Sequence, residues 1–253
     1  RTSPNPMVGA VVVKRGKVVG EGYHSRAGHP HAEVEALRRA GKKAKSADLY
    51  VNLEPCCHFG RTPPCTDAII QAGIKRVIFG MKDPNPQVRG KGMRGLKAKG
   101  IIVLSGVLKE ECMKLNESFA KVIKTGMPFV ILKTAMSLDG KIATRSKDSR
   151  WISGELARKH VHKIRDFVDA ILVGTETVLK DNPHLTCRLV KRSVKHPVRI
   201  ILDRRNRIPL KANVFKNSRS QSVIYVTGPE ISSARRKALQ AKKVEILNGK
   251  CGK

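Results

Sequence analysis

The chain has 253 residues, of which 40% are hydrophobic and 28% charged, and its formal net charge is +31. This length suits two compact domains, and the hydrophobic content excludes an intrinsically disordered chain. No apolar run reaches the roughly 18 residues of a membrane span, and the first residues lack the apolar stretch of a secretory signal, so we expect a cytoplasmic protein that does not enter a membrane.

The first half predicts alternating strands and helices. A β-hairpin is expected where two apolar runs, residues 7–13 and 18–23, flank a turn at Arg15-Gly16-Lys17. A helix is expected over residues 31–40, because alanine recurs at every fourth residue from Ala32 to Ala40. The pattern then predicts a strand at 49–53, a helix at 66–72, a strand at 76–80, a short helix, a strand at 101–104 and one helix over 109–124.

The second half continues the alternation. Strands are expected at 129–134, 170–173, 198–202, 222–226 and 244–247, with helices at 155–167 and 232–242. Strands that alternate with helices indicate the α/β class, with a parallel or mixed sheet.

A histidine, a glutamate and two cysteines form a candidate zinc site. His31-Ala32-Glu33 opens a predicted helix, Cys56 ends the motif Glu54-Pro55-Cys56, and Cys65 lies nine residues further on. Three such ligands leave the fourth zinc position open for water, whose pKa falls to about 7, and the resulting hydroxide can attack an amidine-like ring carbon. Glu33 can carry the proton to the departing ammonia, so the motifs predict a zinc nucleobase deaminase.

A closed structural zinc site is the alternative. It would use His31 or His58 together with Cys56, Cys57 and Cys65. Adjacent cysteines cannot easily face one ion, and a structural site has no use for Glu33. Three of the six cysteines lie close together beside a histidine, which favours metal chemistry in a reducing compartment over disulfides.

The first half resembles a known family. The motifs that carry the resemblance are Thr2-Ser-Pro-Asn-Pro-Met-Val-Gly9, Gly22-Tyr-His24, Pro30-His-Ala-Glu33 and the segment from Glu54-Pro-Cys56 to Gly60-Arg-Thr-Pro-Pro-Cys65. They are similar to the bifunctional riboflavin biosynthesis family, in which a diaminohydroxyphosphoribosylaminopyrimidine deaminase is fused to an aminophosphoribosylaminouracil reductase. The wide spacing between the two cysteines separates this family from tRNA and cytidine deaminases.

The resemblance implies roles for residues of the first half. It makes His31, Cys56 and Cys65 the zinc ligands and Glu33 the proton donor. The substrate-contacting positions would be Asn5, His24, Arg61, Asp83 and Asn85. An arginine suits a substrate that carries a ribose phosphate, because guanidinium binds phosphate through two hydrogen bonds. Cys57 stands where the family usually has a small hydroxyl residue, so it could compete for the metal.

The second half resembles the reductase of the same family. The matching motifs are Lys133–Gly140, Ser149–Ser153, Asp169–Gly174 and Thr177–Arg188. The resemblance implies a fold like dihydrofolate reductase and hydride transfer from NADPH that opens the ribose to a ribityl chain. Cofactor contacts would be Ala135, Trp151, Thr177, Asp181 and Arg204, and substrate contacts would be Ser149, Arg165, Leu185 and Arg188. For Trp151, an ordinary core aromatic is the alternative.

The expected organisation is a deaminase domain followed by a reductase domain. Residues 1–127 would form a cytidine-deaminase-like three-layer domain that binds zinc and acts on a pyrimidine, and residues 128–253 an NADPH-dependent α/β reductase domain. The chain does not begin with methionine, and we expect the family's N-terminal helix to precede it. It ends before the family's glycine-rich cofactor segment, so the reductase is expected to be C-terminally incomplete and to bind NADPH weakly.

A nucleic-acid-binding or RNA-editing deaminase-like protein is the competing class, because a charge of +31 attracts polyanions. Its basic residues are spread along the chain, and few aromatic residues accompany them to stack on bases. An RNA-binding module also has no need of the second-half motifs. The sequence therefore favours a bifunctional hydrolase and oxidoreductase of riboflavin biosynthesis, with Zn²⁺ and NADPH as cofactors and a phosphoribosylated pyrimidine as substrate. A homo-oligomer is expected from the family.

Overall fold

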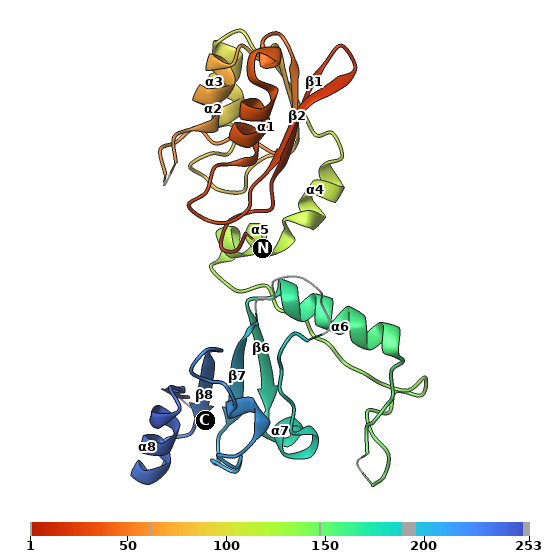
Figure 1. Cartoon of the computed structure of the whole chain (residues 1–253), viewed down its shortest axis with the longest axis vertical. Helices are drawn as coiled ribbons and strands as arrows, with labels where there is room; N and C mark the ends of the chain where they lie inside the picture. The colour runs from red at the N-terminus through yellow and green to blue at the C-terminus, as the bar shows by residue number, and fades with distance from the viewer. Residues whose placement is uncertain (1, 61, 147, 189–195, 250–253) are drawn as a thin grey trace. The chain divides into compact units, whose positions relative to one another are not determined.

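The chain forms two compact units in the computed structural model, which describes residues 2–60, 62–146, 148–188 and 196–249. The units are Arg1–Ile131 and Leu132–Lys253, and each contains its own sheet (Figure 1). Each unit also has its own hydrophobic core. Within the described residues, none of the helices has the length and apolarity needed to span a bilayer.

Five strands form the sheet of the first unit, in the order β2-β1-β3-β4-β5. They are β1 (Gly9–Lys14), β2 (Lys17–Tyr23), β3 (Asp48–Leu53), β4 (Arg76–Met81) and β5 (Ile102–Ser105). Strand β1 is antiparallel to β2 and β3, whereas β3, β4 and β5 are parallel. The carboxyl ends of β3 and β4 therefore meet at one edge, where the chain continues to Cys56 and Asp83.

Helices cover both faces of this sheet. They are α1 (Ala32–Ala40), η1 (Gly41–Ala44), α2 (Cys65–Gln71), α3 (Lys91–Ala98), α4 (Lys109–Leu115) and α5 (Glu117–Thr125). Buried residues of α1, α2 and α3 share one core with Val77 and Phe79 of β4. A side chain at Gly80 would collide with Cys112 of α4, so α4 lies on the opposite face, since successive strand residues point to opposite sides. The expected three layers are thus present.

Helix α1 packs on β2 at very short range, as the predicted alanine stripe requires. Ala32, Ala36 and Ala40 are all buried. A Cβ atom added to Gly22 would lie 2.5 Å from the Ala32 carbonyl oxygen, so only glycine lets the helix approach this strand so closely. This contact fixes the helix whose first turn carries Glu33.

The single helix predicted over 109–124 is wrong, because two helices, α4 and α5, meet at Asn116. Asn116 is 1% exposed. Its side-chain oxygen accepts the Met7 N–H at 2.8 Å, and its side-chain NH₂ donates to the Met7 carbonyl oxygen at 3.0 Å. This pairing holds Asn116 at a φ of −111°, outside the helical range, and breaks the helix.

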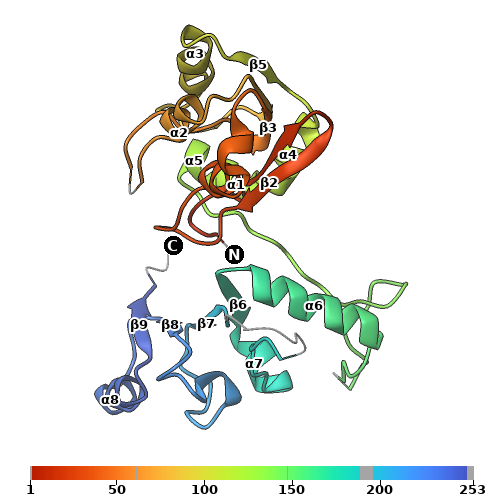
Figure 2. The same cartoon turned by 45° about the horizontal axis from the view of Figure 1, so that its top comes forward.

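The second unit contains a four-stranded parallel sheet in the order β6-β7-β8-β9. The strand labels follow this order in Figure 2. The strands are β6 (Ala170–Gly174), β7 (Val198–Asp203), β8 (Val223–Thr227) and β9 (Glu245–Asn248). The helices are α6 (Glu155–Phe167), α7 (Thr175–Asp181), η2 (Asn213–Phe215) and α8 (Ser233–Ala241). The predicted α/β class is confirmed in both units.

Two features of the second unit differ from the prediction. Helix α7 was not expected. The strand expected over 129–134 is wrong, because this segment pairs with no strand in the described part of the chain. Its side chains are largely exposed, Leu132 at 88%. An apolar run indicates a strand only where a neighbouring strand supplies hydrogen bonds.

Candidate active site

Three potential metal ligands converge in the first unit. The ligand atoms of His31, Cys56 and Cys65 all lie within 4.8 Å of one another. The His31 Nδ1 atom is 3.2 Å from the Cys65 Sγ atom and 3.5 Å from the Cys56 Sγ atom. These separations match the edges of a tetrahedron around zinc, whose bonds to sulfur and nitrogen are about 2.3 and 2.0 Å. The donor set therefore fits a zinc ion.

The close approach of the three ligand groups shifts their pKa values. The hydrogen bond between the two thiol groups lowers the pKa of Cys56 to about 4 and raises the pKa of Cys65. The hydrogen bond with Cys56 raises the pKa of His31. One cysteine is thus a thiolate at neutral pH, the form that binds metal.

Glu33 is a buried acid beside these three ligands, His31, Cys56 and Cys65, which we call the cluster. Its side chain is 3% exposed, and burial raises its pKa to about 7. It forms a hydrogen bond with Cys65. A carboxyl group with this pKa can both accept and donate a proton near neutrality, as a general acid–base requires.

His31 is oriented by neighbours on its other side. Its Nε2 atom lies 3.3 Å from the Thr62 hydroxyl oxygen. Its ring also meets the ring of His24 edge to face, with centroids 5.3 Å apart. The Asn5 side-chain nitrogen is 2.9 Å from His24 Nε2, and His24 Nδ1 is 3.1 Å from the Pro30 carbonyl oxygen. Burial lowers the pKa of His24, which favours a neutral ring. The chain therefore brings Asn5 and His24 to the cluster.

Asp83 and Asn85 belong to the turn after β4. Asp83 is buried, and its Oδ1 atom accepts the Asn85 N–H at 2.8 Å. Burial raises the pKa of Asp83 to about 6, and the charges of Glu54 and then Cys56 contribute to the same shift. This turn thus lies close to the cluster. Arg61, the remaining predicted contact, falls outside the described residues.

The closed structural site gains no support from this geometry. Among the described residues, the converging group consists of His31, Cys56 and Cys65 without Cys57 or His58. The Cys57 Sγ atom lies instead near the Gln87 carbonyl oxygen, at 3.9 Å. A zinc ion held by these three residues would keep its fourth coordination position for water.

In the second unit, two predicted substrate contacts meet at Thr186. Arg165 donates to the Thr186 carbonyl oxygen at 3.5 Å, and Arg188 donates to its hydroxyl oxygen at 3.2 Å. Burial, followed by the charge of Arg188, lowers the pKa of Arg165. Two guanidinium groups this close together favour an anionic ligand. Leu185, the neighbouring contact, is buried in the core.

Further predicted contacts gather around α7. Thr177 and Asp181 stand one turn apart on this helix, so they share a face. The Ser149 hydroxyl lies 3.5 Å from the Asp181 carboxylate. Ala135 lies in the segment after residue 128 that forms neither helix nor strand, and it is half-buried. Trp151 is 71% exposed and stacks under Arg158, so the core alternative for Trp151 is wrong.

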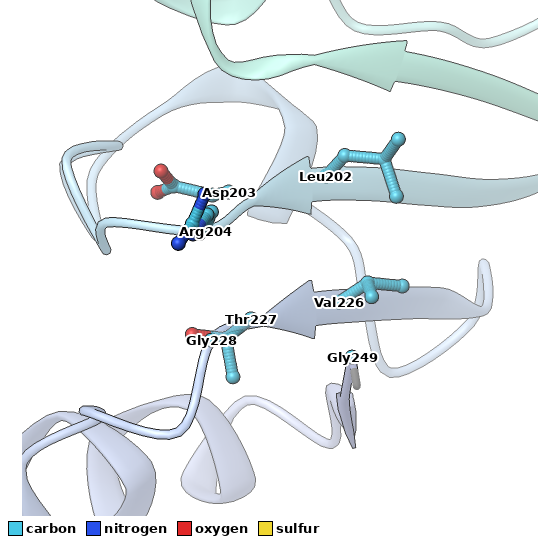
Figure 3. Close-up of a pocket in the computed structure, with 7 residues that line it drawn as sticks. All are labelled: Leu202, Asp203, Arg204, Val226, Thr227, Gly228 and Gly249. Carbon is cyan, nitrogen blue, oxygen red and sulfur yellow. The ribbon is translucent and has the colours of Figure 1, made fainter. Parts of the chain in front are cut away.

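A pocket of about 170 Å³ opens at the carboxyl ends of β7, β8 and β9. Figure 3 shows its lining residues, which are Leu202, Asp203, Arg204, Val226, Thr227, Gly228 and Gly249. Arg204 also lines a neighbouring basic pocket, with Arg205 and Arg207. Carboxyl ends of parallel strands are the usual place for a nucleotide cofactor. Among the residues that line this pocket, only Arg204 could be predicted from the sequence, because the others belong to no recognisable motif.

Family models match both halves of the chain. Residues 1–81 match the cytidine and deoxycytidylate deaminase zinc-binding region, and residues 128–248 match the RibD C-terminal domain. These matches confirm the two predicted fold types and do not favour the nucleic-acid-binding alternative.

Curated relatives match across both halves. The riboflavin biosynthesis protein RibD of Aquifex aeolicus (strain VF5) is 52% identical over 248 residues, covering 98% of this chain and 69% of the relative. RibD of Escherichia coli (strain K12) is 49% identical over 218 residues, covering 82% of this chain and 59% of the relative. The chain thus spans about 59 to 69% of the length of these relatives.

Solved structures agree. Acinetobacter baumannii RibD, form 1, superposes with a TM-score of 0.87 at 43% identity, covering 99% of this chain and 69% of that chain. A diaminohydroxyphosphoribosylaminopyrimidine deaminase/5-amino-6-(5-phosphoribosylamino)uracil reductase from Thermotoga maritima gives a TM-score of 0.84 at 44% identity, covering 98% and 76%.

Proposed function

Because this chain belongs to the RibD family of riboflavin biosynthesis proteins, we propose that it catalyses two successive steps on a phosphoribosylated pyrimidine. The first is hydrolytic deamination of diaminohydroxyphosphoribosylaminopyrimidine in residues 1–127. The second is NADPH-dependent reduction of the ribosyl group to a ribityl chain in residues 128–253. The convergence of His31, Cys56 and Cys65 beside the buried Glu33 is the observation that carries this proposal.

In the deaminase unit, we assign His31, Cys56 and Cys65 as zinc ligands. These residues would hold a zinc ion, which would act as a Lewis acid and make a water molecule a better nucleophile near neutral pH. Glu33 accepts a proton from the attacking water and delivers it to the leaving amino nitrogen, and its pKa of about 7 suits both transfers. Asn5, His24, Arg61, Asp83 and Asn85 would hold the pyrimidine and its phosphate.

In the reductase unit, Arg165 and Arg188 would hold the substrate phosphate, with Ser149 and Leu185 alongside. The positions assigned to NADPH are Ala135, Trp151, Thr177, Asp181 and Arg204. Support comes from the pocket at the strand ends, which includes Arg204, and from the paired guanidinium groups. A cytoplasmic location and a homo-oligomeric state stay predictions.

Two glutamates on α1 provide a matched test of the deaminase. Glu33 is buried beside the cluster, whereas Glu35, two residues on, pairs with Arg38 and is partly exposed. Glu33→Gln should lower ammonia release from the pyrimidine by at least about a hundredfold while zinc content stays at the parent level. Glu35→Gln should match the parent. Release in Glu33→Gln within a few-fold of the parent would refute the role of Glu33.

A further inference from the structure

Glu54 is a buried carboxylate for which the chemistry above provides no role. It directly follows β3 and is separated from Cys56 only by Pro55. Its side chain is 2% exposed. A carboxylate withdrawn from water needs hydrogen-bond donors, because burial without them costs several kcal/mol.

Three backbone N–H groups supply these hydrogen bonds. The Oε2 atom of Glu54 accepts the Asp83 N–H at 3.3 Å and the Gly90 N–H at 2.9 Å. The Oε1 atom accepts the Met93 N–H at 3.1 Å. All three donors belong to residues 83–93, which run from the end of β4 into the first turn of α3. One side chain therefore ties down both ends of this segment.

Hydrogen bonds within the segment 83–93 define the shape of its turn but not its distance from Cys56. Asp83 accepts the Asn85 N–H, and Asn85 in turn accepts the Gln87 N–H at 3.0 Å, so the turn is defined by its own side chains. Neither bond sets the distance between this turn and Cys56. The bonds to Glu54 do, because Glu54 and Cys56 are fixed to each other through Pro55.

The backbone of α3 also lies very close to the backbone of the loop that carries Cys56. A Cβ atom added to Gly92 would lie 2.1 Å from the Pro55 carbonyl oxygen. The first turn of α3 thus rests directly on the residue before Cys56. The N-cap of α3, Gly90, offers no side-chain hydrogen bond, and Glu54 takes up two of the free N–H groups at this helix end instead.

We propose that Glu54 is a positioning residue, whose carboxylate joins the segment 83–93 to the Cys56 loop and so sets where the pyrimidine lies relative to the metal. This inference rests on the proposed function, because it takes Asp83 and Asn85 as substrate contacts. Both oxygens of Glu54 face N–H donors, so the group acts through hydrogen bonds and not as a ligand.

Glu54→Gln tests the proposal directly. An amide nitrogen is a donor, so it cannot replace either oxygen opposite an N–H group, and at least one of the three bonds is lost. We expect the Asp83, Gly90 or Met93 amides to exchange hydrogen about tenfold faster or more. The KM for the pyrimidine should rise by about tenfold with a smaller change in kcat, while zinc content stays at the parent level. Glu35→Gln is the matched carboxylate-to-amide control.

A second pair of variants, both on α3, changes the contact between the segment 83–93 and Pro55. Gly92→Ala places a methyl group against the Pro55 carbonyl oxygen, whereas Gly95→Ala, one turn along the same helix, meets no atom within 4 Å. We expect Gly92→Ala to raise the KM in the same way as Glu54→Gln. Gly95→Ala should leave the KM at the parent value.

Each other outcome counts against the proposal. An unchanged KM in Glu54→Gln would overturn it, as would a loss carried by kcat alone. Loss of zinc or of the native circular dichroism spectrum would also overturn it, because Glu54 would then hold the unit together in general. If the parent protein releases no ammonia, the proposed function fails, and the substrate part of the inference fails with it. Faster exchange at one or more of the three amides in Glu54→Gln would still report that Glu54 holds the segment.

Discussion

At the scale of single residues, we expect the hydrogen bond between Thr62 and His31 to strengthen zinc binding. With Nδ1 facing the two thiol groups, His31 has its Nε2–H free to donate to the Thr62 hydroxyl oxygen, 3.3 Å away. Such partners fix the tautomer and the ring orientation of a metal-binding histidine. We therefore expect Thr62→Val to weaken zinc binding by about tenfold or more.

A chelator competition assay measures this affinity. Thr62→Ser keeps the hydroxyl group and should bind zinc as tightly as the parent. Equal zinc affinity in Thr62→Val and the parent would show that the hydroxyl has no part in orienting His31.

The raised pKa of Asp83 should make the free energy of unfolding of the first unit depend on pH. Burial raises its pKa to about 6 in the folded protein, against about 3.9 in an unfolded chain. The folded state therefore favours the protonated form, so the contribution of Asp83 to stability is complete below about pH 4 and is lost as the pH rises through 6. A group that lowers stability at neutral pH is expected at a functional site.

In metal-free protein, Asp83→Asn should stabilise the first unit at pH 7 by on the order of 2 kcal/mol and change it little at pH 4. Asparagine keeps an oxygen that can accept the Asn85 N–H. Urea unfolding at the two pH values measures the difference. A gain of equal size at both values would contradict the raised pKa.

At the scale of elements, the contact between β2 and α1 holds the helix that carries Glu33. A Cβ atom at Gly22 would lie 2.5 Å from the Ala32 carbonyl oxygen and 2.6 Å from the Ala36 nitrogen, both backbone atoms that cannot rotate away. Gly22→Ala should therefore cost at least about 2 kcal/mol of unfolding free energy.

Gly9→Ala is the control, because Gly9 meets no atom within 4 Å. It should change stability by less than about 0.5 kcal/mol in the same urea titration. If the two variants were equally stable, α1 would not pack on β2 as described.

Much of the fold could be predicted from local pattern. The alanine stripe predicted α1, and the alternation of apolar strands with helices predicted both sheets. The failures came from distant partners. The break at Asn116 depends on Met7, more than a hundred residues away, and no local signal announces it. Residues 129–134 carry a strand-like pattern, but local pattern does not reveal whether a neighbouring strand will pair with them.

In the candidate site too, some features follow from local sequence and others depend on residues far away in the chain. The spacing of His31, Cys56 and Cys65 indicated a metal site, because ligand types and spacing are local. The roles of Thr62 and Glu54 depend on which atoms the fold brings to them. Glu54 had one local sign, an acidic residue at the end of a buried strand, but its three donors lie 29 to 39 residues away.

At the scale of the whole molecule, two separate hydrophobic cores predict two unfolding transitions. The core of the first unit includes Phe79 and Leu96, and that of the second includes Ile201 and Tyr225. Zinc binding stabilises only the unit that holds the ion. A chelator should therefore lower one transition in calorimetry and leave the other at its temperature.

The zinc-loaded protein without chelator is the control. A single transition, or two that fall together when zinc is removed, would contradict independent cores.

We propose above that the first unit uses zinc and Glu33 to replace an amino group of the pyrimidine by oxygen from water. The most direct test is mass spectrometry of the product formed in H₂¹⁸O, with and without zinc. We expect one ¹⁸O atom in the product for each ammonia released by zinc-loaded protein, and no product from metal-free protein. Ammonia release that persists without zinc, or a product without the ¹⁸O label, would contradict it.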